Sequence, residues 1–479
     1  MKAKYYSLIG LLFLVFSFQS CEDNDDVYVS SVQNFIWKGL NLYYLWQADV
    51  PNLANDRFAN QTELNYFLYG YPVPEKLFND LRVDKTIDRF SWIVDDYLEL
   101  EGELQGNTNN NGVDFGLSYK DKASGSKEVI GWVRYIIPNS NASSKEIKRG
   151  DLFYGVNGTQ LTIDNYKSLL FGSNNDYDLN LANYDGGAYT PNGKSIPLTK
   201  TSLAENPILI NKVIVSGSHK IGYLMYNGFY SNYDTQLNEA FGFLKSQGIT
   251  DLVLDLRYNG GGSVQSATRL ASMITGSFTG QVFAKQQWNA KIQVKISSAN
   301  STNFFTDEVE FSPINSLNMT KVYILTTKST ASASELVING LTPYINVIQV
   351  GDVTTGKNVG SITLYDSPTF GKNNRNPNHR YAMQPIVLKI VNSKGFGDYQ
   401  SGLNPTYPQV EYINSLGSLG ETSETLLSIA VTKITGVGRL KQPTSENNFD
   451  YLDDSKSNTI LKNQMYLEKL PEGLANALK

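Results

Sequence analysis

Residues 252–263 read LVLDLRYNGGGS, an apolar run that passes directly into three glycines and a serine. The run 252–256 has the length and apolar character of a buried strand, and helical spacing over about 263–275 follows the glycines. Strands and helices alternate in the same way between Ile208 and Gly436. The other predicted strands are Ile221–Met225, Val322–Thr326 and Val347–Val350, and the other predicted helices are Tyr233–Ser246 and Ser332–Leu341. This alternation predicts a layered α/β core.

The glycine loop allows two interpretations. Gly261 and Gly262 permit positive φ angles and a close approach of the backbone, which suits a plain tight turn. Backbone N–H groups at a strand-to-helix turn also bind anions, so the loop equally suits half of an oxyanion hole. It lacks the lysine of a phosphate-binding loop and the spaced glycines of a dinucleotide fold.

A second strand-to-helix junction holds the sequence TASASEL, residues 330–336. Ser332 with Glu335 three positions later fits a helix capping box, in which the cap stabilises a helix by about 1 kcal/mol. The same position suits a nucleophilic serine, with the backbone N–H of Ala333 directed at a developing oxyanion. The two interpretations share a backbone and differ in where the hydroxyl points.

A third segment, TTGKNVG at residues 354–360, contains Lys357. Burial between apolar strands disfavours the charge on a lysine and lowers the pKa of its amine. A neutral amine can take a proton from a serine hydroxyl. Taken alone, the segment also fits an exposed turn.

In this order the three segments resemble the C-terminal processing peptidases, also called tail-specific proteases, over roughly residues 220–436. Residues 255–262 are similar to the family's Asp-Leu-Arg-Asn-Asn-Pro-Gly-Gly motif, with Tyr258 and Gly260 as replacements. The resemblance implies that Ser332 is the nucleophile and Lys357 the general base. Their separation of 25 positions (357 − 332) agrees with the family's spacing.

The resemblance also implies a core of the crotonase/Clp-like type, with Gly261, Gly262 and Ala333 as oxyanion donors. Many family members carry a glutamine four positions after the lysine, which orients the amine. Ser361 stands there in this chain and is the candidate support. An acidic residue found in some members is replaced by Pro343.

A β-rich module is predicted upstream of the core. Its strand-like runs are Val113–Tyr119, Val129–Ile137 and Leu152–Val156, and Asn157-Gly158 predicts a hairpin turn. Two of its sequences resemble a PDZ domain, and the resemblance implies a module that binds a peptide as an added strand. Each of the two sequences alone also fits a plain hairpin. One is residues 148–158, and the other is the implied carboxylate-binding loop Phe115, Gly116, Leu117 and Ser118.

The first residues resemble an export signal. Lys2 and Lys4 precede an apolar run over residues 8–18, which is typical of a secretory signal peptide and is too short for a stable membrane span. Residues 18–21 resemble the lipobox of bacterial lipoproteins, which implies that Cys21 is acylated. We expect an envelope protein held by its lipid, at an outer membrane and facing the periplasm or the cell surface. An ordinary signal peptide with an incidental cysteine is the alternative.

The composition excludes several function classes. A net charge of −5 and a pI near 5.4, without a basic cluster, argue against nucleic-acid binding. Cys21 is the only cysteine, so internal disulfides and cysteine-ligated metal are excluded. The two histidines, His219 and His379, lie near no other metal-ligand type at a usable spacing. We therefore expect exposed loop histidines, no metal, no organic cofactor and a general base other than histidine.

The predicted fold class is α/β and multidomain. Its parts are a signal peptide over 1–21, an acidic tether with an aromatic-rich helical domain over 22–105, the PDZ-like module over 106–205, the peptidase core over 206–436 and a polar tail over 437–479. The predicted function is a secreted serine endopeptidase that cuts peptide or unfolded protein tails through an acyl-enzyme. The alternatives are a catalytically decayed peptide-binding lipoprotein and, from the abundant tyrosines, a surface glycan-binding lipoprotein.

Overall fold

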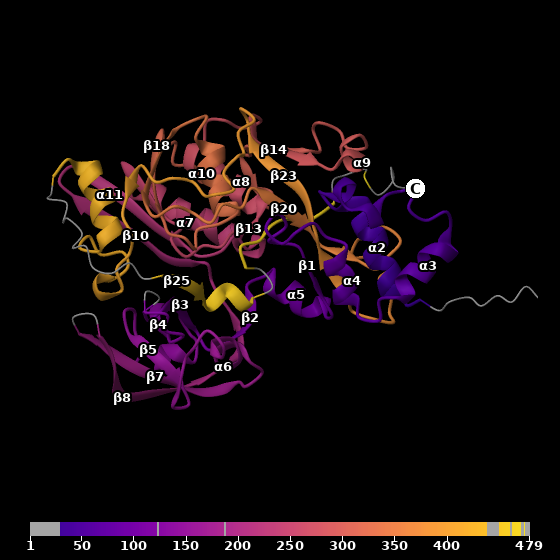
Figure 1. Ribbon diagram of the computed structural model, residues 1–479. Coiled ribbons are helices and arrows are strands. Elements are labelled where there is room, and N and C mark those ends of the chain that lie inside the picture. Colours follow the sequence, from indigo (N-terminus) through magenta and orange to yellow (C-terminus); the bar gives the residue numbers. More distant parts are fainter. Residues whose placement is uncertain are drawn as a thin grey trace, which may run out of the picture.

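The computed structural model describes residues 29–121, 124–185, 188–437, 450–459, 462–470 and 474. The predicted signal peptide and Cys21 lie outside these residues. Figure 1 shows a layered core, a β-rich unit below it and a group of N-terminal helices at one end.

The first sheet of the core has six strands in the order β10-β11-β12-β18-β19-β24. Strands β11 to β24 run parallel, and β10 pairs antiparallel with β11. Residues 252–254 are fully buried, as expected of a parallel strand covered on both faces. The bounds are β10 Ile208–Ser216, β11 His219–Tyr226, β12 Asp251–Asp255, β18 Lys321–Thr326, β19 Asn346–Gly351 and β24 Tyr407–Pro408.

Helices cover both faces of this sheet. Leu254 packs in one apolar cluster with α7 (Asp234–Ser246), α8 (Val264–Thr275) and α10 (Ala333–Leu341). Val253 packs in another with α11 (Thr425–Thr435). Successive residues of β12 thus face opposite helical layers. The strand–helix alternation predicted for the core is confirmed, with bounds that differ by one or two residues.

A second six-stranded sheet, β13-β26-β20-β23-β14-β15, joins three distant segments. Strand β13 ends the glycine loop, and β20 begins two residues after Lys357. The C-terminal strand β26 lies between them and runs parallel to both. The bounds are β13 Gly262–Ser263, β26 Met465–Leu467, β20 Val359–Ile362, β23 Ile386–Asn392, β14 Val282–Trp288 and β15 Thr302–Phe304.

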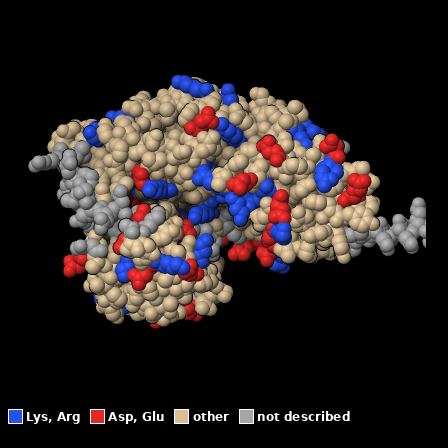
Figure 2. All heavy atoms as spheres, in the orientation of Figure 1, with Lys and Arg blue, Asp and Glu red and all other residues tan. Residues whose placement is uncertain are grey.

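The β-rich unit has its own apolar core and a sheet of order β25-β3-β4-β5-β7-β8, with β6 paired to β5. The predicted strands in this unit and the Asn157-Gly158 hairpin are confirmed, since both turn residues have positive φ and join β5 to β6. The bounds are β3 Val113–Tyr119, β4 Val129–Ile136, β5 Leu152–Val156, β6 Thr159–Gln160, α6 Tyr166–Phe171, β7 Asp176–Asp185, β8 Ala188–Thr199 and β25 Tyr451–Asp454. Figure 2 shows the notch between this unit and the rest of the chain, with basic side chains along it.

The N-terminal part is mainly helical, with α2 (Ser31–Tyr43), α3 (Gln61–Tyr69), α4 (Pro74–Asp80) and α5 (Tyr97–Glu103). Phe35 and Leu40 of α2 are buried in the same apolar cluster as α8 and α10. These helices therefore pack on the core as part of it. A small sheet adds to the contact: β1 Trp92–Val94 pairs with β22 Ala382–Gln384, which pairs with β21 Leu364–Tyr365.

Two segments differ from expectation. The polar run 106–112, whose glycine and asparagine content is typical of a linker or loop, contains β2 (Asn107–Asn110), which pairs with β9 (Thr201–Ala204). The expected polar tail contributes β25 and β26 to two different sheets. Both segments are held by partners far away in the sequence, which local patterns do not reveal. The remaining short elements are α9 Ala290–Gln293, β16 Glu308–Val309 and β17 Ser312–Pro313, with 3-10 turns at Gln47–Asp49, Pro51–Leu53, Ala142–Ser144, Ser231–Tyr233, Ile413–Ser415 and Ser455–Asn458.

Candidate active site

Ser332 occupies the sharp turn between β18 and α10, with a φ of +66°. A positive φ strains any residue with a Cβ, and such strain gathers at functional sites. Ser332 and Glu335 have the outline of a capping box, but the Ser332 side chain makes no cap hydrogen bond. Its buried Oγ has no hydrogen-bond partner among the described residues. The geometry favours a free hydroxyl over the helix cap.

Lys357 follows β19 and is fully buried. Burial lowers the pKa of its amine to about 7, against the opposing charges of Asp88 and Glu335. Its Nζ donates to Gln464 Oε1 at 3.0 Å and lies 4.6 Å from the centre of the Phe90 ring. An amine that is partly neutral at neutral pH has the protonation behaviour of a general base.

The carboxylate of Glu335 joins the serine and lysine segments. The backbone N–H groups of Ser332 and Lys357 donate to the same Glu335 oxygen, at 2.7 and 2.8 Å. The other oxygen accepts from Gly356 N at 2.7 Å and from Thr354 Oγ1 at 2.5 Å. Burial raises the pKa of Glu335, and these four donors oppose that rise. Their charge-assisted bonds keep the two segments side by side.

The glycine loop passes directly beside the serine. Gly261 and Gly262 have φ angles of +109° and +133°, where a side chain is strained. A Cβ added to Gly261 would lie 2.6 Å from Ser332 Cβ, 2.6 Å from the Gln464 carbonyl oxygen and 3.0 Å from Ala333 N. The loop, the serine turn, the start of α10 and the C-terminal segment therefore meet at one point.

The three predicted oxyanion donors are in different states. The N–H of Gly261 donates to Asn259 Oδ1 at 2.9 Å, within its own loop. The N–H of Gly262 donates to the main-chain oxygen of Gln464 at 2.6 Å. The N–H of Ala333 belongs to the first turn of α10, where intrahelical acceptors are missing. Both glycine N–H groups thus donate within the protein, Gly261 to its own loop and Gly262 to the C-terminal part of the chain.

The predicted support of the amine differs from expectation. Ser361 Oγ lies 3.0 Å from Gln384 Oε1 and 3.3 Å from the Met465 carbonyl oxygen, so its single proton is directed at these two acceptors in the sheet and not at Lys357. The amide oxygen near the amine comes from Gln464, 107 positions after the lysine. Gln464 lies in a polar segment without a motif, and no signal in the sequence points to it.

A buried charge network fixes the base of the glycine loop. Arg257 is fully buried and pairs with Asp255 and Glu424, at 2.8 and 2.7 Å. Tyr258 Oη donates to Glu411 and accepts from Arg149 Nη1 at 2.8 Å. Arg149 belongs to the β-rich unit, so Tyr258 connects that unit to the loop.

The predicted carboxylate-binding loop, Phe115–Ser118, lies within strand β3 and not in a loop. Its edge is already paired with the chain's own strand β25, in antiparallel register. The N–H of Phe115 donates to Ser455 Oγ at 3.2 Å, and Ser118 Oγ donates to the Asp450 carbonyl at 3.0 Å. The residues expected to receive a peptide are thus in contact with the C-terminal part of the same chain.

Neither histidine is the exposed loop residue that was expected. His219 begins β11 and pairs with Asp251 at 2.7 Å, and His379 pairs with Asp366 at 2.9 Å. Neither has a recorded hydrogen bond to Ser332 in the described part of the chain. Within that part no cluster of three or more metal-ligand side chains occurs. In the same described residues, no helix has the length and apolar content needed to cross a membrane.

Two family models match the chain. Residues 220–367 match Peptidase family S41, and residues 31–92 match the Peptidase S41 N-terminal domain. The first match contains the glycine loop, Ser332 and Lys357, and the second covers most of the N-terminal helices. The family expected from the three motifs is confirmed.

Similar proteins agree with these matches. The chain is 23% identical over 229 residues to a carboxyl-terminal-processing protease of Picosynechococcus sp., covering 44% of this chain and 51% of that protein. It is 27% identical over 258 residues to a chloroplastic C-terminal processing peptidase of Tetradesmus obliquus, covering 51% of each. The chain thus spans about half the length of these curated relatives. A crystal structure from Bacteroides fragilis, provisionally described as an S41 protease, superposes with a TM-score of 0.65 at 27% identity, covering 85% of this chain and 98% of that one.

Proposed function

Because the chain belongs to the C-terminal processing peptidase family, we propose that it is a serine endopeptidase that cuts peptide or protein tails with Ser332 and Lys357. The observation that carries the proposal is that Glu335 holds together two segments, one with an unpartnered serine hydroxyl on a strained turn and one with a buried lysine whose pKa is lowered to about 7. Glu335 holds both segments through adjacent hydrogen bonds.

The proposed reaction has two steps. Neutral Lys357 takes the proton of the Ser332 hydroxyl as Oγ bonds to the substrate carbonyl carbon, and the N–H groups of Gly262 and Ala333 stabilise the oxyanion. The carbon–nitrogen bond then breaks, and the Lys357 ammonium gives its proton to the leaving amine. A water deprotonated by Lys357 then attacks the acyl carbon, the bond from that carbon to Ser332 Oγ breaks, and the Lys357 ammonium returns the proton to Oγ as the new carboxyl end leaves.

The β-rich unit is proposed as the substrate-docking module, of PDZ type. Strand β3 has an edge that accepts an added strand, which is the mode by which such modules bind peptides. We also propose that the N-terminal residues act as an export signal and that an acylated Cys21 holds the enzyme at an outer membrane, facing the periplasm or the cell surface. Its partners there are unfolded or extended polypeptides, and it requires no metal and no organic cofactor.

The test uses the chain from residue 22 onward and a set of unstructured polypeptides with apolar C-terminal ends. Mass spectrometry of the products should show internal cleavage by the wild type and a loss of at least a thousandfold in kcat/KM for Ser332→Ala. Equal cleavage by both proteins would refute the assigned nucleophile.

The catalytically decayed peptide-binding lipoprotein is the second candidate, and one observation favours it. The Lys357 amine bonds to Gln464, while the Ser332 hydroxyl has no recorded partner among the described residues. Retained peptide binding by wild-type protein that cuts none of the polypeptides would select this candidate.

A further inference from the structure

The C-terminal part of the chain lies along the β-rich unit as an added strand. In β25, Asp453 and Asp454 pair with Leu117 and Gly116 of β3. Asp454 also forms an ion pair with Arg134 at 3.1 Å, and both side chains are buried. Burial alone would raise the pKa of Asp454, and Arg134 overrides it and holds that pKa at about 2. The strand is therefore held by main-chain pairing and by a buried charge.

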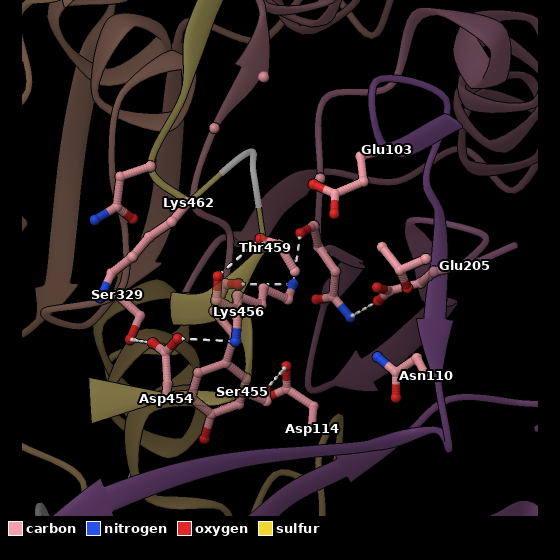
Figure 3. Close-up of a pocket in the computed structure, with 18 of the residues that line it drawn as sticks. Glu103, Asn110, Asp114, Glu205, Ser329, Asp454, Ser455, Lys456, Thr459 and Lys462 are labelled. Carbon is pink, nitrogen blue, oxygen red and sulfur yellow. Dashed lines mark hydrogen bonds between the residues drawn. The ribbon is translucent and has the colours of Figure 1, made fainter. Parts of the chain in front are cut away.

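The same part of the chain then crosses from the β-rich unit to the core. Asp454 accepts from Ser329 Oγ of the core at 2.9 Å, and Ser455 Oγ donates to Asp114 at 2.9 Å. Lys456 Nζ donates to the carbonyl of Tyr258, beside the glycine loop, at 3.2 Å. Asp454, Ser455 and Lys456, labelled in Figure 3, line a cavity of about 60 Å³ that the glycine loop also lines.

Beyond this crossing, the chain enters the catalytic centre. Strand β26 lies between the glycine-loop strand β13 and the lysine strand β20. The Gln464 carbonyl oxygen accepts the Gly262 N–H at 2.6 Å, and its side-chain oxygen accepts the Lys357 amine at 3.0 Å. Met465, the next residue, is fully buried in the core. A main-chain carbonyl thus occupies Gly262, one of the two N–H donors that the proposed mechanism assigns to a scissile carbonyl.

One requirement of catalysis is blocked by these contacts, because the Gly262 donor is already filled by the main-chain oxygen of Gln464. We infer that the C-terminal segment, residues 450–459 and 462–467, is an intramolecular pseudosubstrate that occupies both the peptide edge of the β-rich unit and the catalytic cleft. The inference rests on the proposed function of this site.

The two contacts share one chain, so they release together. A tethered ligand acts at an effective concentration of about the millimolar range, and a free substrate has to displace it. A polypeptide that pairs with β3 replaces β25, removes the bond to Arg134 and loosens the strand in the cleft. Docking on the β-rich unit thereby opens the active site, and the substrate class is an extended chain long enough to reach from β3 to Ser332.

The first experiment removes the anchor of β26. Met465→Asp places a charge in the core and should expel the strand, raising kcat/KM at least tenfold while the melting temperature of the protein still shows a cooperative fold. Lys469→Ala, at an exposed position two residues after β26, is the matched control and should leave kcat/KM unchanged. A folded Met465→Asp protein with equal or lower activity would show that β26 is a structural strand and would overturn the inference.

The second experiment needs no destabilised variant. Hydrogen exchange is followed in the Ser332→Ala protein, with a synthetic peptide copying residues 450–470 or its scrambled version. The copy should speed exchange at 451–454 and 465–467 at least fivefold and leave β23 unchanged, whereas equal protection with both peptides would contradict displacement. Displacement of the C-terminal segment without cleavage by any variant would refute the proposed function alone. Cleavage without displacement of the segment would refute this inference alone.

Discussion

Replacing Lys357 with methionine should abolish activity and yet stabilise the protein, by an amount that depends on pH. The unfolded amine is protonated up to pH 10.5, whereas the buried amine loses its proton near pH 7. Between pH 7 and pH 10.5, unfolding of the protein takes up one proton at Lys357. The free energy of unfolding of the wild type therefore rises by roughly 1.4 kcal/mol per pH unit over this pH range. The methionine side chain has no titratable proton, and its shape is similar to that of lysine. The variant's advantage is therefore largest at and below pH 7, on the order of 5 kcal/mol before the lost bond to Gln464 is subtracted.

Urea unfolding at pH 7 and pH 9.5 measures this effect directly. The stability gap between Lys357→Met and wild type should shrink by roughly 3 kcal/mol between the two pH values, because other titrating groups contribute equally to both proteins. Lys328→Met, at an exposed position, is the control whose gap should stay constant. A constant gap for Lys357→Met would refute the claim that this amine is buried and neutral.

Three further outcomes are expected. The rate constant kcat should rise with pH through about 7 as Lys357 loses its proton, and a profile flat from pH 5 to 9 would contradict its role as base. Glu335→Gln places an amide N–H₂ group among the four N–H and O–H donors that now bond to the carboxylate, so kcat should fall at least a hundredfold with little change in KM. Only Glu335→Asp, which keeps a carboxylate, should restore part of the activity. A change in KM alone would contradict a positioning role. Burial raises the pKa of Asp114 to about 6, although the positive charges of Lys456 and Arg134 act to lower it. Above that pH the ionised, buried carboxylate therefore lowers the stability of the protein. Asp114→Asn should stabilise the protein by about 3 kcal/mol at pH 7 in urea unfolding, with no gain below pH 4.

The parts of the fold that local pattern encodes could be predicted. Strands β3 and β5 have the predicted bounds, because their apolar residues lie in continuous or alternating runs between clear turns. The serine and lysine segments could also be located, because each sits at a junction whose neighbours have strong patterns. Their chemistry needed the family motif, since a capping box and an exposed turn explain the same residues.

The rest depends on contacts between distant segments. Strands β25 and β26 have four and three residues, and they form only because edges in two other parts of the fold accept them. Gln464 reaches Lys357 for the same reason. The second role of Glu335 could not be predicted for a different reason. Its capping pattern is visible in the sequence, but its hydrogen bonds to the N–H groups of Gly356 and Lys357 form only when the lysine segment folds against it.

The low pKa of Lys357 depends on what fills the cleft, because desolvation is its main cause. When the C-terminal segment leaves and water enters, the amine regains hydration and its pKa rises toward 10.5. A bound substrate expels that water again and lowers the pKa back toward 7. In Met465→Asp the profile of kcat/KM, which reports the free enzyme, should therefore rise at a pH at least one unit above that of kcat, which reports the complex. Coincident pH profiles would mean that the surrounding protein alone excludes water from Lys357. Occupancy of the cleft would then not control the pKa of the amine.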